Sequence, residues 1–331
     1  MQDRTAHMLA GIDLSSGRGL EIGALASPVV TKQMGQISYV DHADTATLRA
    51  DFAGRAEVDI EQIVDVDYVL GQATVSDAVG GDGLFDYVIA SHVIEHVPDL
   101  IGWLIDLRRV LRAGGVISLA IPDKQQCFDI LRPPTTAADL VDAHLRRERR
   151  PTPRQIFEHY SSAVSWDGKI SWTRHPVLAD LTPMHSDESA LERAKAATAD
   201  GDYADVHCWV FTPESFAGVM VSLQRLGLLP YVVERRTDTM WAEFFVLLRA
   251  QDPDPTVLEG LPAADALASG SGSSLAVLAE ERARAAHLET ERDAARAALA
   301  ETLASQSWRV TRPLRVVNER ARRLVSRVRR H

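Results

Sequence analysis

Short apolar runs that alternate with amphipathic stretches constrain the fold more than any other feature of this sequence. Five such runs lie at residues 19–23, 36–41, 66–71, 85–91 and 115–122. Runs of this kind are typical of strands covered on both faces by helices, as in parallel sheets. Between the last two, residues 99–115 have apolar side chains at intervals of three and four, and Gly114-Gly115 is expected to end this helix. The alternation predicts a doubly wound α/β sheet.

The last part of this pattern predicts how the sheet ends. Residues 212–228 are expected to form a helix with Thr212 as its N-cap and Pro213 at its first position. Two strand-like runs, 230–236 and 241–250, follow with a gap too short for a crossover helix, so they should pair antiparallel. The expected fold is therefore a seven-stranded, mostly parallel sheet with a terminal antiparallel hairpin, followed by a C-terminal helical extension.

A long insertion and a changed composition divide the rest of the chain. Residues 123–211 have weak periodicity and hold five of the eleven His, which predicts a substrate pocket or lid within a domain spanning 1–251. Residues 252–274 have the composition of a flexible linker. Residues 275–305 are almost entirely helix formers and predict a long solvated helix, with a coiled coil and homo-oligomer as the alternative. Residues 306–331 form a basic tail.

The turn after the first run suggests the ligand of this domain. In "GLEIGALASP" a strand reaches Glu21 and Gly23, and the further glycines of a dinucleotide fingerprint are missing. A ligand with an adenosine and no pyrophosphate needs only one tight turn, an acid near its amino group and an acid for its ribose. Asp41 ends the second run at the spacing expected of a ribose-binding carboxylate. S-adenosylmethionine meets these requirements.

Four segments resemble the class I S-adenosylmethionine-dependent methyltransferases. They are "LEIGALASPVV", "YVDHADTATLRADF", "FDYVIASHVIEHVPDLIGWLIDLRRVLRAGGVISLAIPDK" and "VHCWVFTPESF". The resemblance covers about residues 15–250, and the closest group is bacterial and associated with cell-surface glycan biosynthesis. It implies that Glu21, Gly23 and Asp41 hold the cofactor, that Leu70, Gly71 and Gln72 flank the adenine, and that Ser91 and His92 lie near the sulfonium.

Three histidines are candidates for a general base, because methylation of a hydroxyl requires removal of its proton. His92 and His96 lie in "SHVIEH" after the fourth run, and His207 lies in "DVHCWVF". The spacing of His92 and His96 also matches a two-histidine metal face, but no third ligand is visible in the sequence, so no metal is predicted. Asp123, at the tip of the fifth run, is a further candidate for binding substrate hydroxyls, with a turn aspartate as the alternative.

The charge distribution suggests the partners. The net charge of −10 argues against nucleic acid as the main partner, whereas 306–331 contain nine Arg and one Glu. Apolar residues share one face of this tail, which is typical of a basic amphipathic helix that lies on an anionic membrane surface. No signal peptide or membrane span is expected, and Cys127 and Cys208 are expected to be reduced, buried thiols. The sequence predicts a cytoplasmic enzyme, peripheral on the inner membrane face, that methylates a sugar or glycan acceptor.

Two other functions remain open from the residues alone. One is a non-catalytic adaptor with a degenerate methyltransferase fold, because the first turn has lost most of its glycines. The other is a nicotinamide-dependent sugar oxidoreductase, which the same missing glycines disfavour, since a pyrophosphate needs close approach to the backbone.

Overall fold

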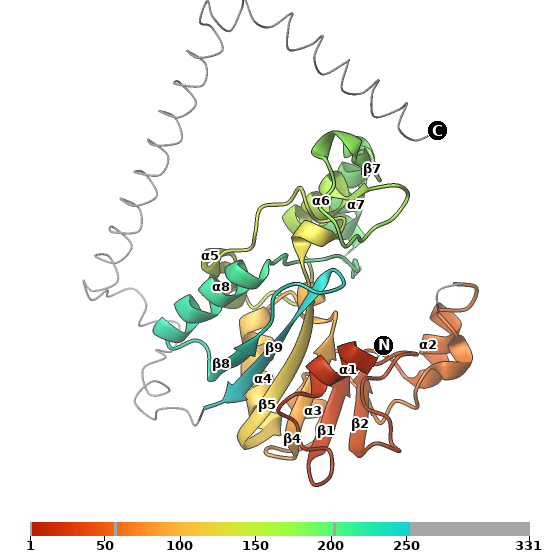
Figure 1. Ribbon diagram of the computed structural model, residues 1–331. Coiled ribbons are helices and arrows are strands. Elements are labelled where there is room, and N and C mark those ends of the chain that lie inside the picture. Colours follow the sequence, from red (N-terminus) through yellow and green to blue (C-terminus); the bar gives the residue numbers. More distant parts are fainter. Residues whose placement is uncertain (1, 56–57, 201–202, 252–331) are drawn as a thin grey trace, which may run out of the picture. The chain divides into compact units, whose positions relative to one another are not determined.

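A seven-stranded sheet forms the centre of the computed structural model, which describes residues 2–55, 58–200 and 203–251 (Figure 1). The strand order is β3-β2-β1-β4-β5-β9-β8. The strands are β1 (Arg18–Ile22), β2 (Gln36–Asp41), β3 (Tyr68–Val69), β4 (Phe85–Ser91), β5 (Leu111–Pro122), β8 (Tyr231–Arg236) and β9 (Glu243–Ala250). The first five pair in parallel, and β9 is antiparallel to both β5 and β8. The predicted sheet and its terminal hairpin are confirmed, and the predicted segments from 252 onward lie outside the described residues.

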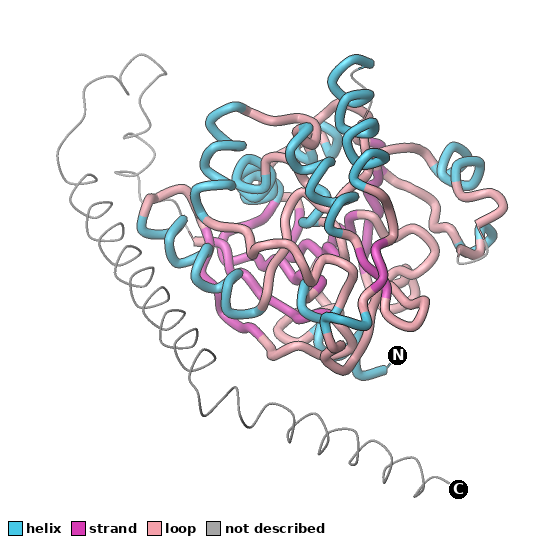
Figure 2. The backbone as a smooth tube through the Cα atoms, turned by 90° about the horizontal axis from the view of Figure 1, so that it is seen from above, coloured by secondary structure: helices cyan, strands magenta, loops and turns pink. Residues whose placement is uncertain are grey.

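The helices lie around this sheet (Figure 2). They are α1 (Gln2–Leu9), α2 (Thr45–Asp51), α3 (Val75–Val79), α4 (Leu100–Val110), α5 (Ala137–Arg146), α6 (Pro153–Ser162), α7 (Asp187–Asp200) and α8 (Pro213–Arg225). Short 3₁₀ turns follow several strands: η1 (Ile60–Gln62), η2 (Ile94–His96), η3 (Lys124–Gln126) and η4 (Leu178–Asp180). Within the described residues, no helix is long and apolar enough to cross a membrane.

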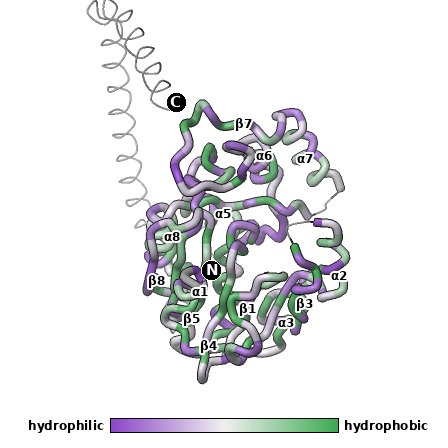
Figure 3. The backbone as a smooth tube through the Cα atoms, turned by 45° about the vertical axis from the view of Figure 1, so that its right-hand side comes forward, coloured by the Kyte–Doolittle hydropathy of each residue, from purple (hydrophilic) through white to green (hydrophobic). Residues whose placement is uncertain are grey.

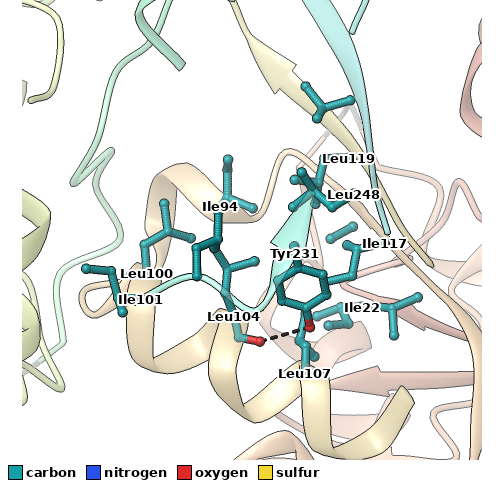
Figure 4. Close-up of a cluster of buried hydrophobic side chains, with 14 of the residues drawn as sticks. Ile22, Ile94, Leu100, Ile101, Leu104, Leu107, Ile117, Leu119, Tyr231 and Leu248 are labelled. Atoms are coloured by element: carbon teal, nitrogen blue, oxygen red, sulfur yellow. Dashed lines mark hydrogen bonds between the residues drawn. The ribbon is translucent and has the colours of Figure 1, made fainter. Parts of the chain in front are cut away.

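Helix α4 covers one face of the sheet, because its apolar residues recur on one side. Leu100, Leu104 and Leu107 are buried against strand residues such as Ile117 (Figure 4). The hydroxyl of Tyr231 in β8 donates to the Leu104 carbonyl at 3.0 Å, so the edge hairpin is fixed to α4 by a buried hydrogen bond as well as by packing. This face carries the larger of the apolar clusters, and α3 and α8 contribute to it.

The opposite face is covered by α1 and a loop. A second apolar cluster joins Met8 of α1 to Val29, Val30, Tyr39 and Phe245. No helix lies between β1 and β2, since residues 23–35 form only turns and bends. A loop therefore takes the place of the helix that usually joins the first two strands of a doubly wound sheet. The Tyr39 hydroxyl donates to the Val30 carbonyl at 2.8 Å, which helps the loop to cover the sheet in place of a helix.

Two predicted boundaries differ from the structure. The helix predicted over 99–115 ends at Val110, and Gly114 lies inside β5 with a φ of 71°. The pairing of β4 with β5 shifts register between Phe85 and Tyr87, so the glycines accommodate an irregular strand start rather than a helix end. The strand predicted over 66–71 is reduced to Tyr68–Val69 at the sheet edge. The prediction for Thr212 is confirmed, because its side chain accepts from the Ser215 amide in a capping box.

The insertion 123–211 contains three helices and a two-stranded sheet of β6 (Val164–Ser165) and β7 (Thr182–Pro183). Figures 1 and 3 show α6, α7 and β7 beyond the end of the sheet at which β5 finishes. A backbone bridge between Asp123 and Phe211 joins the two ends of the insertion. The insertion is therefore anchored at the carboxyl edge of the sheet, where ligands bind in open α/β folds.

Candidate functional site

The carboxyl ends of neighbouring parallel strands bring the predicted site residues to one edge of the sheet. β2, β1 and β4 are adjacent, and they end at Asp41, Ile22 and Ser91. Because these strands run in parallel, residues that are far apart in the sequence follow one another across this edge. The residues predicted at the ends of the first, second and fourth runs therefore share this edge, which is where open α/β sheets bind ligands.

Gly23 makes the bend after β1, as predicted. Its φ is 68°, a left-handed conformation that favours glycine, and a Cβ there would lie 3.3 Å from Val93 Cγ2. Leu25 also has a positive φ, of 45°. The turn is thus tight despite having one glycine, and no helix N-terminus follows it to bind a phosphate.

Glu21 holds the loop that follows β1. Its side chain is buried, and the amides of Val29 and Val30 donate to its two carboxylate oxygens at 2.6 and 3.0 Å. Burial raises its pKa to about 7, although these two hydrogen bonds and the charge of Arg4 oppose the rise. These hydrogen bonds hold in place the loop that covers the sheet. A contact between Glu21 and the cofactor stays a prediction.

Asp41 and the segment after β3 lie together. The amide of Leu70 donates to the Asp41 carbonyl at 2.8 Å, and the amide of Gly71 donates to the His42 carbonyl at 3.1 Å. The Asp41 carboxylate accepts from the His42 amide through Oδ1 at 2.7 Å. Gly71 and Gln72 are exposed, and a Cβ at Gly71 would meet no atom within 4 Å. A carboxylate thus lies beside an open surface, although none of these residues is shown to bind a ligand.

The end of β4 carries an ion-paired histidine. His92 has a φ of 55°, and its Nε2 lies 2.8 Å from Oε2 of Glu243 in β9. Arg4 of α1 donates to both Glu243 oxygens, at 2.6 and 2.9 Å, and to the Ser91 hydroxyl at 2.6 Å. Burial opposes the charged imidazolium, but the Glu243 hydrogen bond and the charges of Glu95 and Glu243 outweigh it and raise the pKa of His92. The side chain of His92 is 46% exposed, and its Nδ1 lies 3.6 Å from Glu95 Oε1.

His96 and His207 are brought together although 111 positions separate them. Their ring centroids lie 4.8 Å apart. His207 Nδ1 lies 2.6 Å from Asp129 Oδ2, and His96 Nδ1 lies 2.7 Å from Asp205 Oδ1. Burial disfavours the charged form of His96, but Asp205 and Glu95 outweigh it and raise the pKa of His96. The sequence predicted these histidines as alternatives for one role, whereas the structure places them in one cluster.

Asp123 is not available to bind a substrate. It is buried, its Oδ1 accepts from the Gln125 amide at 2.8 Å, and its Oδ2 accepts from the Thr239 hydroxyl. The alternative interpretation as a turn aspartate is confirmed. Cys127 and Cys208 are free and buried, as expected, and burial raises the pKa of the Cys208 thiol to about 12.

Sequence reasoning missed several residues that build this site. Glu243 lies near the start of the last predicted strand run, 241–250, and Arg4 lies in an N-terminal segment for which the sequence predicts no site residue. Asp129 and Asp205 lie in the weakly periodic insertion. A charged residue at the start of an otherwise apolar strand was the one available signal for Glu243, because an unpaired carboxylate is rare in such a position.

Comparisons with known proteins found one matching family profile and several solved structures of low similarity. Residues 12–119 match the profile of a family described as "Methyltransferase domain". No curated protein matches the sequence. Among solved structures, a methyltransferase from Mesorhizobium loti is 12% identical, with 75% of this chain and 96% of that chain covered and a TM-score of 0.39. A possible histamine N-methyltransferase from Thermotoga maritima is 13% identical, with 75% of this chain and 89% of that chain covered, and has a TM-score of 0.36. A 1,6-didemethyltoxoflavin-N1-methyltransferase from Burkholderia thailandensis is 10% identical, with 76% of this chain and 78% of that chain covered, and has a TM-score of 0.35.

Proposed function

We propose that this chain is a class I S-adenosylmethionine-dependent methyltransferase that methylates a hydroxyl group of a sugar or glycan intermediate of cell-surface polysaccharide synthesis, and its matched methyltransferase profile and strand order support this. The family profile ends before the insertion, so the acceptor has to be argued from the residues around the carboxyl edge of the sheet. The observation that carries the proposal is the pairing of a half-exposed His92 with Glu243.

The residues at the sheet edge fit the cofactor. The Asp41 carboxylate can accept hydrogen bonds from the two ribose hydroxyls, and Gly71 beside it leaves open space where a side chain would stand. The left-handed Gly23 turn replaces the glycine-rich helix start that a pyrophosphate would need. When bound, S-adenosylmethionine supplies an electrophilic methyl group on a sulfonium sulfur.

His92 is the proposed general base. As the acceptor oxygen gains the methyl group it must lose its proton, and a histidine held by a carboxylate can take up that proton. Glu243 occupies Nε2, which leaves Nδ1 for the acceptor, and it stabilises the imidazolium that forms. Arg4 fixes Glu243 from its other side, so Glu243 is a positioning residue.

Two features support a sugar as the acceptor. Sugars offer hydroxyl groups, which need a base, whereas an amine acceptor with a free lone pair does not. The sequence also resembles methyltransferases associated with surface glycans, both in the catalytic domain and in the "SWRVTRPLR" segment of the tail. The insertion, anchored beside His92 at the carboxyl edge, provides the surface on which such an acceptor would be held.

Turnover measured on a panel of sugar nucleotides, with release of S-adenosylhomocysteine as the signal, tests the proposal. We expect His92→Gln to lower kcat by about 100- to 10,000-fold while the cofactor Kd stays within about threefold of wild type. The matched control is His175→Gln, which removes an exposed histidine of the insertion. A folded His92→Gln variant with wild-type kcat would contradict the base assignment, and methylation of amine acceptors alone would contradict the sugar.

The tail carries the second part of the proposal, membrane association. Residues 306–331 lie outside the described residues, and the support is their sequence: nine Arg around an apolar stripe, which suits an anionic interface. Flotation with vesicles containing anionic lipid compares the full chain with a chain that ends at residue 274. We expect only the full chain to float with the vesicles, and equal recovery of both would contradict membrane binding.

A further inference from the structure

Glu95, His96 and His207 converge on one point next to the proposed base. One possible ligand atom from each residue lies within 4.8 Å of the others. The convergence follows from a backbone contact, because the Cys208 amide donates to the Glu95 carbonyl at 2.6 Å. This bond holds the end of the insertion against η2, the turn that carries Glu95 and His96.

The Glu95 carboxylate is buried without a hydrogen-bond partner. The residue is 2% exposed, and neither carboxylate oxygen has a hydrogen-bond partner within the part of the chain that the structure describes. The nearest cationic atoms, His92 Nδ1 and His96 Nε2, lie 3.6 and 4.0 Å from Glu95 Oε1. A buried carboxylate costs several kcal/mol unless it is hydrogen-bonded, closely paired or coordinates a metal, and two imidazoles at these distances, without a hydrogen bond, meet that need only in part.

Carboxylates also hold the two histidines. Asp129 Oδ2 accepts a hydrogen bond from His207 Nδ1. Arg132 Nη1 donates to the other oxygen of Asp129, Oδ1, at 3.0 Å. Asp205 lies close to His96 Nδ1, although the pair is not aligned as a hydrogen bond. With both Nδ1 atoms facing carboxylates, the Nε2 atoms are left as ligands. Histidines that bind metals are usually oriented in this way by a carboxylate behind the ring.

The geometry points to a site for one divalent transition-metal ion, such as Zn²⁺, bound by the Glu95 carboxylate and the Nε2 atoms of His96 and His207. Imidazole ligands favour such ions over Mg²⁺ and Ca²⁺, which prefer oxygen. In a tetrahedral site with bonds of about 2.1 Å, two ligand atoms lie about 3.4 Å apart, so the observed separation of up to 4.8 Å requires the side chains to close by roughly 1 to 1.5 Å.

The ammonium of a neighbouring lysine is hydrogen-bonded outside the cluster. Lys124 lines the same pocket as Glu95 and His207, but its ammonium donates to the Ile130 carbonyl at 2.8 Å. Three protein ligands leave a coordination position open, which an oxygen of the acceptor can fill. Because His92 Nδ1 faces Glu95, that oxygen would lie near the proposed base. This ligand set differs from the His92 and His96 pair that the sequence spacing suggested. His96 is common to both sets, but the other ligands here are Glu95 and His207 instead of His92.

Calorimetric titration of chelator-treated, full-length protein with Zn²⁺ alone tests the site. We expect one equivalent to bind, and we expect Glu95→Gln, His96→Gln and His207→Gln each to weaken binding by at least about 100-fold. Asp129→Asn should weaken binding by about 10- to 100-fold, because it only orients a ligand. The control His175→Gln should bind as wild type does.

Titration of the wild-type protein with Co²⁺ gives a second measurement that needs no variant to fold. Visible d–d absorption that saturates at one equivalent and is displaced by Zn²⁺ supports the site. Absence of stoichiometric Zn²⁺ binding, or wild-type binding by folded His96→Gln and His207→Gln variants, would overturn it. Neither measurement uses S-adenosylmethionine or an acceptor. A negative result in these metal titrations therefore would not contradict the proposed methyltransferase function, and absence of methyltransferase activity would not contradict the metal site.

Discussion

Replacing Glu21 with Gln tests the finding that a buried carboxylate, rather than a helix, organises the segment after β1. In the wild type, two backbone amides donate to the Glu21 carboxylate, and burial raises its pKa from an ordinary 4.5 to about 7. Gln has nearly the same shape and keeps one acceptor oxygen, but it cannot ionise. Its amide nitrogen is a donor and would face one of the two backbone amides, a cost that does not depend on pH, so the charge of Glu21 is read from the pH dependence alone.

The expected effect depends on pH. A carboxylate whose folded pKa is raised contributes stability below pH 4.5, and this contribution is lost as the pH rises through about 7. The difference between the two pKa values corresponds to roughly 3 kcal/mol at 1.36 kcal/mol per pH unit. The free energy of unfolding of wild type minus that of Glu21→Gln should therefore fall by about 2 to 3 kcal/mol between pH 5 and pH 8.

Urea unfolding, followed by far-UV circular dichroism at about pH 5, 6, 7 and 8, measures this difference. Glu61→Gln serves as the matched control, because Glu61 is exposed and its removal should give no such trend. A wild-type-minus-Glu21→Gln difference that stays constant within about 0.5 kcal/mol over this range would refute the reasoning, since it would mean that burial does not perturb Glu21.

Two further changes test other parts of the structure. Asp41→Asn should raise the Kd for S-adenosylmethionine by about 10- to 100-fold in calorimetry, because it replaces an acceptor-only carboxylate beside the open Gly71; an unchanged Kd would remove Asp41 from the cofactor site. Tyr231→Phe should lower the free energy of unfolding by about 1 to 2 kcal/mol in a urea titration, because it leaves the buried Leu104 carbonyl without its 3.0 Å hydrogen bond; a loss below about 0.3 kcal/mol would show that α4 and the edge hairpin do not depend on it.

Local patterns in the sequence predicted most of the sheet and one helix cap. The apolar runs predicted strands because burial on both faces requires continuous apolar side chains, and Thr212 was identifiable because an N-cap needs only residues within the next turn. The same local reasoning failed at Gly114-Gly115. There, a shift in the pairing of β4 and β5, which involves a distant strand, ended α4 earlier than its own residues suggested.

The sequence by itself determined that the sheet is mostly parallel and which residues follow each strand, and the ends of parallel strands share one edge of a sheet. Only the tertiary structure decided what those residues contact. Glu21 turned out to bind a loop, His92 received Glu243 from the last strand, and His207 reached Glu95 across the insertion. Such pairings depend on side chains separated by many residues in the chain, and no local periodicity records which distant group will lie within hydrogen-bonding distance.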